Sequence, residues 1–249
     1  MTELFSDPKV IQQVGYILAE TPTAIWETIY STVLATLLAY IIGLPLGVLL
    51  VAGEQGGVRP LPRPLMNVVN VAVNLLRSVP FLILMVVVFP LSRVIVGTSI
   101  GTMGTIVPLT IAAFPFVARL VESSIRELDK GVVEAAQAMG ASPFQIIRKV
   151  MLPECLPSLI SGFTTAFITI LSYGAMSGAI GGGGLGKMAL NLGFTRHNML
   201  VLWWAVILLV ILVQIIQTIG TYLSVKLDKR LAGKAGGRRA RKAEKAGIQ

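Results

Sequence analysis

Charged residues are scarce in this sequence. Of its 249 residues only 13% are Asp, Glu, Lys or Arg, whereas 54% are hydrophobic, and the mean hydropathy is +0.78. A soluble domain usually carries about 25% charged residues. The deficit argues against a soluble protein with an unusually apolar core and indicates a membrane protein.

Cysteine and histidine are nearly absent as well, with Cys155 and His197 the single examples. One cysteine cannot form an internal disulfide, and one His with one Cys cannot build an ordinary zinc cluster or a catalytic triad. No nucleophile–base pair is apparent. We therefore expect no catalytic residues and no metal ligands, which argues against an intramembrane enzyme.

The few charges leave long uncharged runs. A transmembrane helix needs about 20 apolar residues, and short alternating strands typical of a membrane barrel are absent. A run at 64–92 is interrupted only by Arg77, and four runs carry no charge: 28–53, 94–118, 155–186 and 197–225. The sequence therefore predicts an all-α integral membrane protein with five transmembrane helices.

Three regions follow from these runs: an external segment at 1–22, a five-helix transmembrane domain at 23–225 and a tail at 226–249. The first 20 residues lack the basic and then apolar pattern of a signal peptide, and 8–20 is a candidate short interfacial helix. Five spans place the two termini on opposite sides of the membrane.

The distribution of Lys and Arg predicts the orientation. The side that holds loop 119–154 and the tail carries most of them, and the other side holds only Lys9, Arg93, Lys187 and Arg196. Cytoplasmic loops are enriched in Lys and Arg, so the N-terminus should be outside and the C-terminus cytoplasmic.

The tail carries nine of the 21 Lys and Arg residues. Without apolar periodicity it should be disordered and lie near anionic lipid headgroups, or act only as a topogenic signal. It has no aromatic residue for base stacking, so we do not expect nucleic-acid binding.

Loop 119–154 is too long for a simple connection, and its composition is not that of a flexible linker. We expect two short helices around a tight bend. The first, at 128–139, should end at Gly140, because glycine adopts the left-handed conformation at little cost.

The second helix should begin after Ser142, a favourable N-cap, with Pro143 at the first helical position. Gln145 completes a capping-box pattern. The helix should run to about Met151 and end at Leu152-Pro153. We call the whole segment, residues 128–153, the elbow.

Apolar residues share one face of each elbow helix at helical spacing: Val132, Ala135, Ala136 and Met139 on the first, and Phe144, Ile147 and Met151 on the second. Small residues at the tip permit close approach of another surface, and Glu134 supplies a charge for a hydrogen bond or ion pair. Such an elbow either docks a protein or lies on the membrane.

Glu134-Ala135-Ala136, followed by Gly140 and Leu152-Pro153, resembles the EAA signature of ABC importer permeases. In that family the elbow is a coupling helix that docks in a groove on a cytoplasmic ATPase, so the resemblance implies an ATPase docked on Glu134–Pro153. The resemblance implies these ATPase-coupling residues: Glu134, Ala135, Ala136, Met139, Gly140, Ala141, Leu152 and Pro153.

The resemblance extends over residues 20–226 and is to the methionine importer permeases within that family. It rests on five further stretches: 77–81, 94–101, 106–110, 115–119 and 138–143. It implies a permease subunit in the cell inner membrane that moves methionine or a related amino acid. A second copy of the chain, a dimer of ATPase subunits and a periplasmic or lipid-anchored substrate-binding protein would be its partners, and ATP and Mg would bind the ATPase.

Two other transport functions remain open at this point. An ABC permease for another small solute is the nearer alternative. A self-sufficient channel or an ion-driven transporter would need ionisable residues at several mid-span positions, and only Arg77 is found there.

A glycine-rich segment at 181–187 matches phosphate-binding motifs in the order of its residues, but not in their context. Met188 stands where a P-loop needs Ser or Thr, no strand precedes the glycines, and the predicted topology places them outside the cell. We expect a turn or gate element instead.

The fourth uncharged run contains many small residues, which allow helices to approach closely. A chain of five helices makes a thin wall for an aqueous path, so we expect a homodimer with the path on its two-fold axis. Tyr173, Met176 and Ser177 are candidate path or gate residues, although Tyr173 and Met176 could equally face lipid or the core.

Arg77 is the fourth candidate path residue. A charge within a span usually faces a cavity or a partner. It could meet a substrate carboxylate, pair with backbone carbonyls or Glu154, or extend towards the cytoplasmic interface.

Overall fold

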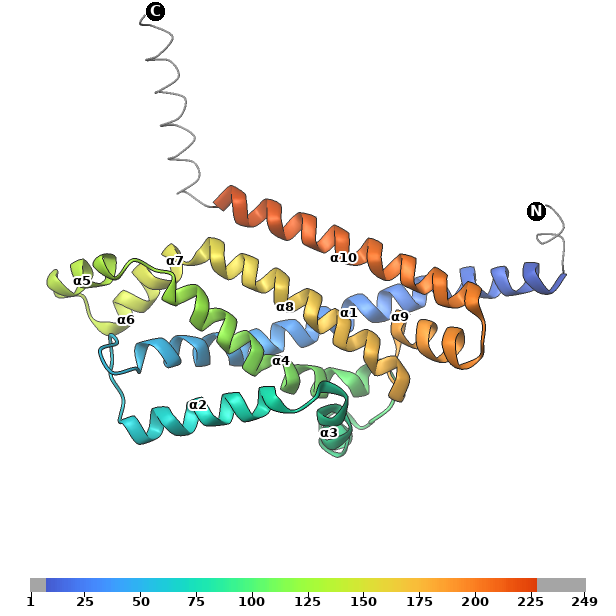
Figure 1. Cartoon of the computed structure of the whole chain (residues 1–249), viewed down its shortest axis with the longest axis horizontal. Coiled ribbons are helices and arrows are strands. Elements are labelled where there is room, and N and C mark those ends of the chain that lie inside the picture. Colours follow the sequence, from blue (N-terminus) through green and yellow to red (C-terminus); the bar gives the residue numbers. More distant parts are fainter. Residues whose placement is uncertain (1–7, 228–249) are drawn as a thin grey trace, which may run out of the picture.

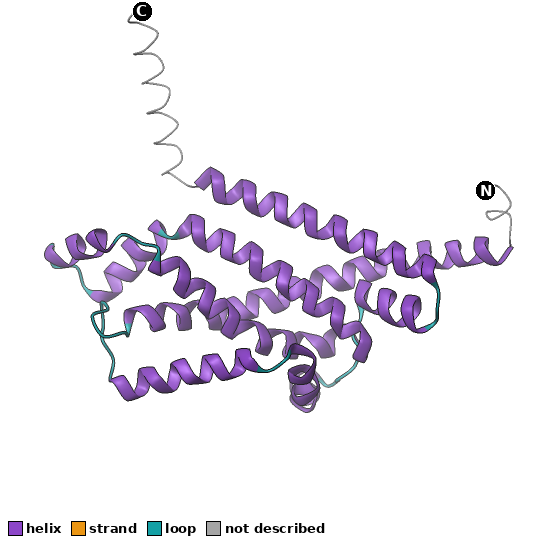
Figure 2. Cartoon of the chain, in the orientation of Figure 1, coloured by secondary structure: helices purple, strands orange, loops and turns teal. Residues whose placement is uncertain are grey.

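The computed structural model describes residues 8–227, with side chains from Val14 onward. Every regular element in this range is helical (Figure 2). The predictions for residues 1–7 and for the tail at 228–249 fall outside the described residues.

Four helices are long and apolar enough to cross a membrane: α1 (Pro8–Ala52), α4 (Gly101–Arg126), α8 (Leu156–Ser177) and α10 (Met199–Leu227). A fifth crossing is obtained if α2 (Arg63–Ser78) and α3 (Phe81–Val96) count as one bent span. The long helices lie along a common direction (Figure 1). The all-α membrane fold is therefore confirmed.

Short helical elements occupy the two ends of the bundle (Figure 1). The elbow end carries α5 (Lys130–Ala138), α6 (Pro143–Ile146), a π-helical turn (Ile147–Met151) and α7 (Leu152–Glu154). The opposite end carries a 3-10 turn (Gly178–Ile180), α9 (Gly184–Lys187) and a second π-helical segment (Met188–Thr195). α1 starts at the opposite end and α10 finishes towards the elbow end.

The predicted second span, 64–92, is not one helix. α2 stops at Ser78, and α3 leaves at an angle of 106° after Val79 and Pro80. Val79 has a ψ of 126°, the extended conformation that a residue before proline favours. As a result α3 is seen nearly end-on in Figure 1, whereas α2 lies along the bundle.

The predicted third span, 94–118, is also misplaced. Gly97 and Gly101 have φ values of 80° and 79°, so the chain leaves α3 at Gly97 and enters α4 at Gly101. α4 then continues to Arg126, and the first eight residues of the predicted loop 119–154 are helical. An uncharged run does not reveal such breaks, because glycine interrupts a helix without adding charge.

The other predicted spans agree better with the structure. The run 197–225 corresponds to α10, whereas the run 155–186 ends early because α8 gives way to the 3-10 turn after Ser177. The predicted interfacial helix at 8–20 is helical but continuous with the first span. α1 has 45 residues, about 68 Å at 1.5 Å per residue.

Two glycines bring α1 and α4 into close contact. A Cβ added at Gly43 would lie 2.8 Å from the Phe114 carbonyl oxygen, and one at Gly47 would lie 2.5 Å from the Ala118 carbonyl oxygen. The spacing is that of the G-x-x-x-G pattern, which lets membrane helices pack backbone to backbone. This seam fixes α4 against the longest helix.

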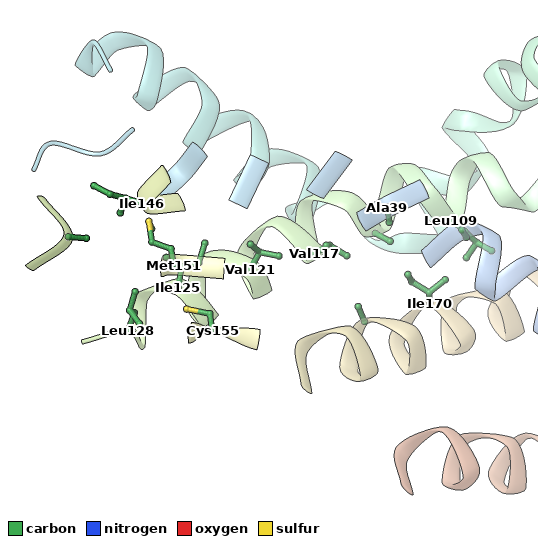
Figure 3. Close-up of a cluster of buried hydrophobic side chains, with 14 residues drawn as sticks. Ala39, Leu109, Val117, Val121, Ile125, Leu128, Ile146, Met151, Cys155 and Ile170 are labelled. Atoms are coloured by element: carbon green, nitrogen blue, oxygen red, sulfur yellow. The ribbon is translucent and has the colours of Figure 1, made fainter. Parts of the chain in front are cut away.

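One hydrophobic cluster joins the bundle to the elbow (Figure 3). Ala39 and Leu109 lie in its bundle part, and Ile146 and Met151 of the elbow belong to the same cluster. Val121 of α4 lies between them along the chain of contacts. Because packed interiors transmit strain, displacement of the elbow must move α4 or repack this core.

Candidate functional site

The first arm of the elbow is α5. Asp129 caps it, because its Oδ1 accepts a hydrogen bond from the Gly131 N–H at 2.9 Å. Gly140 follows with a φ of +77°. The predicted helix that ends at a left-handed glycine is confirmed, although α5 begins at Lys130 rather than residue 128.

The second arm begins with the predicted capping box. Ser142 Oγ accepts from the Gln145 N–H at 3.4 Å, and Gln145 Oε1 accepts from the Ser142 N–H at 2.9 Å. Each side chain satisfies a backbone group that the helix start leaves unpaired. The bend between the arms is therefore built from the local residues 140–145.

The second arm does not end at Leu152-Pro153, so this prediction is wrong. A π-helical turn at Ile147–Met151 leads into α7, which contains Pro153 and ends at Glu154. Proline lacks an N–H, and in an α-helix its ring clashes with the carbonyl four residues earlier. The wider turn, in which the Leu152 N–H donates to the Ile147 carbonyl, accommodates Pro153.

The apolar face predicted for the first arm is mostly exposed. Only Ala136 of its four residues is buried, at 3% exposure, and the half-buried Val133 packs beside it. Val132 and Met139 are 40% and 81% exposed. Packing against the second arm decides which side of the first arm is buried, because Ala136 belongs to the cluster that includes Ile146 and Met151.

The π-helical turn decides which residues of the second arm are buried. Ile146 and Met151 are buried at 2% and 3% exposure, whereas Phe144 is 68% exposed. These two buried residues are five positions apart, a spacing that a π-helical turn brings to one side. The predicted set of Phe144, Ile147 and Met151 assumed ordinary helical spacing.

The predicted coupling residues divide between surface and interior. The exposed group is Glu134, Ala135, Met139, Gly140 and Pro153, while Ala136 is buried and Ala141 and Leu152 are half-buried. Ala141 belongs to the interior edge of the bend, since its N–H donates to the Ala136 carbonyl at 3.1 Å. The exposed coupling residues thus combine the large apolar side chain of Met139 with small residues and the Glu134 carboxylate.

Glu134 lines a cavity of about 470 Å³ between the elbow and the loop after α1. Glu54, Arg126 and Lys130 also line it. Within residues 8–227 Glu134 has no hydrogen bond or ion pair from its side chain, whereas Arg126 bonds to Glu54 at 2.8 Å. The Glu134 carboxylate is thus available to a group from outside the chain.

One of the four candidate path residues, Tyr173, lies at an aromatic contact between α8 and the broken span. Tyr173 of α8 stacks on Phe81, the first residue of α3, with ring centroids 4.3 Å apart and planes 8° from parallel. Met176 lies one turn further along α8 and is 41% exposed. The stack joins α8 to the chain directly after the bend at Pro80.

Ser177 and Arg77 differ in exposure. Ser177 is 1% exposed, and its Oγ donates to the Gly174 carbonyl at 2.6 Å, so its side chain is packed inside this chain. Arg77 lies in the last turn of α2 and is exposed. Among the described residues it forms no ion pair, and the proposed pairing with Glu154 is not present.

One face of α8 carries a row of hydroxyl groups, which we call the hydroxyl stripe: Ser161, Thr165 and Ser172 are exposed, and Thr169 is half-buried. Each of the last three donates to the carbonyl four residues earlier, at 2.8–3.0 Å. The spacing of three and four residues places them on one helix face. Met176 continues the row.

The first half of α10 provides a contrast to the hydroxyl stripe. Its exposed large side chains are apolar and include Leu200, Trp203, Ile207, Val210 and Ile211. Lipid contact favours such a surface. Sequence reasoning noted the small residues of α8 but missed that its hydroxyls share an exposed face.

The glycine-rich turn is held by α1. The Gly184 N–H donates to Glu27 Oε2 at 2.6 Å, and the Leu185 N–H donates to Thr28 Oγ1 at 2.8 Å. These are the backbone donors that a phosphate would require, and a carboxylate already occupies one of them. The turn follows helical residues, so the geometry supports its interpretation as a structural turn.

The residues that enzymes most often use are not assembled in a site. Cys155 is buried at 4% exposure, and His197 lies in the connection before α10 with a φ of 56°. No group of three or more His, Cys, Asp or Glu within the described range could hold a metal ion.

Sequence reasoning missed a charged cluster on α4. Glu122, with an 11% exposed side chain, contacts Arg119 at 2.5 Å and Arg126 at 3.0 Å. Arg126 also contacts Glu54, in the loop between α1 and α2. The spacing R-x-x-E-x-x-x-R was the available signal, since residues three and four apart meet on a helix surface.

Comparisons with known proteins agree with this architecture. Residues 43–233 match the family model described as "Binding-protein-dependent transport system inner membrane component". A probable D-methionine transport system permease protein of Vibrio cholerae is 49% identical over 211 residues, which cover 84% of this chain and 92% of that protein. A methionine import system permease protein of Bacillus subtilis is 44% identical over 213 residues, 86% of this chain and 96% of that protein.

A solved structure is also similar to the whole fold. A chain of the MetNI methionine ABC transporter, described as being in inward facing conformations, superposes with a TM-score of 0.81 at 43% identity, over 85% of this chain and 96% of that chain. The resemblance that the elbow motif indicated is confirmed. The chain belongs to the family of binding-protein-dependent transport system inner membrane components, and it is a multi-pass permease of the inner membrane without an ATPase of its own.

Proposed function

We propose that the chain is the permease subunit of an ABC importer that moves methionine or a related amino acid into the cell. The observation that carries the proposal is the 49% identity to a D-methionine permease over 92% of that protein's length. Similarity of this extent includes the long helices and the elbow, and both would serve the same transport reaction.

The elbow end is the cytoplasmic end in this proposal. Lys130, Arg148 and Lys149 are exposed there, and Lys226 lies at the last described turn of α10. An excess of Lys and Arg favours the cytoplasmic side. The start of α1 would then be outside, where a periplasmic or lipid-anchored substrate-binding protein would deliver its solute.

The exposed elbow residues would form the docking surface for a cytoplasmic ATPase subunit, which binds ATP and Mg. Met139 and Phe144 are 81% and 68% exposed, so their burial against a partner would remove large apolar surfaces from water. The small residues beside Gly140 permit close approach. Glu134 adds a carboxylate that would hydrogen-bond or pair within the interface.

An elbow that merely lies on the membrane is the competing interpretation. Two features favour the ATPase. The elbow shares a hydrophobic cluster with α4, so a force applied to it reaches the bundle. The exposed Glu134 carboxylate suits a protein interface better than a lipid surface that is itself anionic.

A docking experiment tests this assignment. The permease would be co-expressed with its ATPase and purified through a tag on the permease. The variant Met139→Glu with Phe144→Asp is expected to lose the ATPase, because it places two charges in an apolar contact. The matched control is Phe194→Asp, which changes a 64% exposed phenylalanine at the opposite end. Equal recovery of the ATPase with both variants would overturn the docking assignment.

The hydroxyl stripe of α8 would line the solute path between two copies of the chain. Three of its four hydroxyl residues are exposed within a span and Thr169 is half-buried, whereas the first half of α10 exposes apolar side chains that suit lipid. A two-fold axis beside α8 would place two stripes across one aqueous path. Tyr173, Met176 and Arg77 are the path or gate candidates next to it, and the buried Ser177 would support them through packing.

The substrate has its own test. Purified complex in liposomes, with the binding protein outside and ATP inside, would be tested against labelled methionine and a panel of other amino acids and small solutes. We expect ATP-dependent uptake of methionine. Uptake of a different solute with none of methionine would favour an ABC permease of other specificity, and uptake without ATPase or ATP would favour a channel or an ion-driven transporter.

A further inference from the structure

α2 is held to the rest of the chain by few apolar contacts. Only Met66 and Val73 of its 16 residues are buried. An element that contributes so little to the core needs another means of attachment if it is to follow the bundle when the bundle moves.

A polar contact supplies that attachment. Arg119 Nη2 of α4 donates to Asn70 Oδ1 at 3.1 Å and to Asn74 Oδ1 at 2.9 Å. The two asparagines are four residues apart and therefore lie on one face of α2. One guanidinium thus holds two successive turns of α2 against α4.

The same guanidinium is fixed by a largely buried carboxylate. Glu122 contacts both Arg119 and Arg126, and its side chain is 11% exposed. Hydrogen bonds between ionised groups are shorter and stronger than those between neutral groups. Glu122 therefore orients Arg119 towards Asn70 and Asn74.

The network also reaches the elbow. Arg126 is the last residue of α4, and α5 begins at Lys130. Arg126 bonds to Glu54 in the loop between α1 and α2, and both residues line the cavity that Glu134 lines. Arg126, which shares Glu122 with Arg119, therefore lies between the elbow and the rest of the network.

We propose that this network, which we call the latch (Glu54, Asn70, Asn74, Arg119, Glu122 and Arg126), transmits motion of the elbow to α2. These are positioning residues that act on the solute path through the broken span. α2 ends at Ser78, and Phe81 after the bend stacks on Tyr173. The inference rests on the proposed function, because it requires an elbow that an ATPase moves.

The geometry favours transmission of the elbow's motion through the hydrogen bonds of the latch rather than through the apolar contacts of α2. Only two residues of α2 are buried, Met66 and Val73, so its apolar packing alone fixes the position of α2 along α4 weakly. The hydrogen bonds of Arg119 to two asparagines fix both the distance and the register. Separation of α2 from α4 would leave a largely buried arginine without these acceptors, which is unfavourable.

The test measures solute taken up per ATP hydrolysed, with the complete complex in liposomes. In Asn70→Leu with Asn74→Leu, both acceptors of Arg119 are lost, and we expect this ratio to fall by about fivefold or more. Asn70→Asp with Asn74→Asp retains an oxygen acceptor at each position and should keep a ratio near that of the unmodified complex. Asn67→Leu is the matched control, since Asn67 is exposed on the same helix and has no side-chain hydrogen bond within the described residues.

A ratio for the double leucine variant equal to that of Asn67→Leu would overturn the latch. So would a parallel loss of uptake and hydrolysis at constant ratio, because that result indicates impaired assembly rather than lost transmission. Failure of the unmodified complex to take up methionine would instead contradict the proposed substrate. In that case the ratio is measured with the solute that the complex does transport.

Discussion

The close contact between α1 and α4 predicts a large difference between two identical substitutions on one helix. A Cβ at Gly47 would lie 2.5 Å from the Ala118 carbonyl oxygen and 2.7 Å from Val121 Cβ. Ordinary contacts of a Cβ begin near 3.4 Å, so Gly47→Ala must move the helices apart by about 1 Å. Gly15→Ala is the control, because a Cβ at Gly15 meets nothing within 4 Å.

The magnitude follows from the cost of overpacking, about 1–3 kcal/mol. Both variants gain the same helix propensity from alanine, so the difference between them isolates the contact. Each kcal/mol shifts Tm by roughly 2–4 °C in a chain of this size. We expect the Tm of Gly47→Ala, measured by thermal unfolding in detergent, to be about 2–12 °C below that of Gly15→Ala. Equal Tm values would refute the reasoning that α1 and α4 touch backbone to backbone.

Three further predictions concern the elbow, the gate candidate and the glycine-rich turn. Gly140→Pro should abolish recovery of the ATPase with the permease. Gly140→Ala should weaken this recovery, because a φ of +77° costs alanine about 1–2 kcal/mol. Full recovery of the ATPase with Gly140→Pro would contradict the elbow geometry. Tyr173→Ala should raise passive solute leak from ATP-free liposomes. Tyr173→Phe should not raise it, because phenylalanine retains the stack on Phe81. Identical leak through the two variants would remove Tyr173 from the gate. Glu27→Ala should lower the Tm through an unpaired Gly184 N–H, at about 1–3 kcal/mol, while Glu27→Gln retains an acceptor and should change the Tm less.

Local signals in the elbow were predictable because neighbouring residues determine them. Gly140 ends one arm and Ser142 with Gln145 begins the next, and each depends on residues within the same turn. The residue at which each arm begins or ends was less predictable. The π-helical turn before Pro153 accommodates the proline ring inside the arm, which ends only at Glu154, and the residues alone did not indicate this.

The inner faces of the elbow arms depended on tertiary contacts. Ala136 is buried because Ile146 and Met151 lie against it, and Met139 is left exposed. A short helix with apolar residues on several sides does not reveal which side will be covered. The exposed apolar side chains thus became visible only in the structure.

The membrane spans show a similar division. Composition was sufficient to predict a helical membrane fold with four to five crossings, but the bend at Val79 and Pro80 and the glycine breaks at Gly97 and Gly101 lie inside the apolar runs. Hydropathy measures transfer into lipid and is insensitive to such breaks. The bend places Phe81 beside Tyr173, which is a gate candidate.

The central claim is that an ATPase docked on the elbow drives methionine through this chain. The most direct measurement is the accumulation of labelled methionine inside liposomes that hold the complete complex, the binding protein and ATP, compared with the same complex carrying Glu134→Lys. The account predicts accumulation above the external concentration by the unmodified complex, and little accumulation by the variant at unchanged insertion into the membrane. Equal ATP-dependent accumulation by both complexes would contradict it.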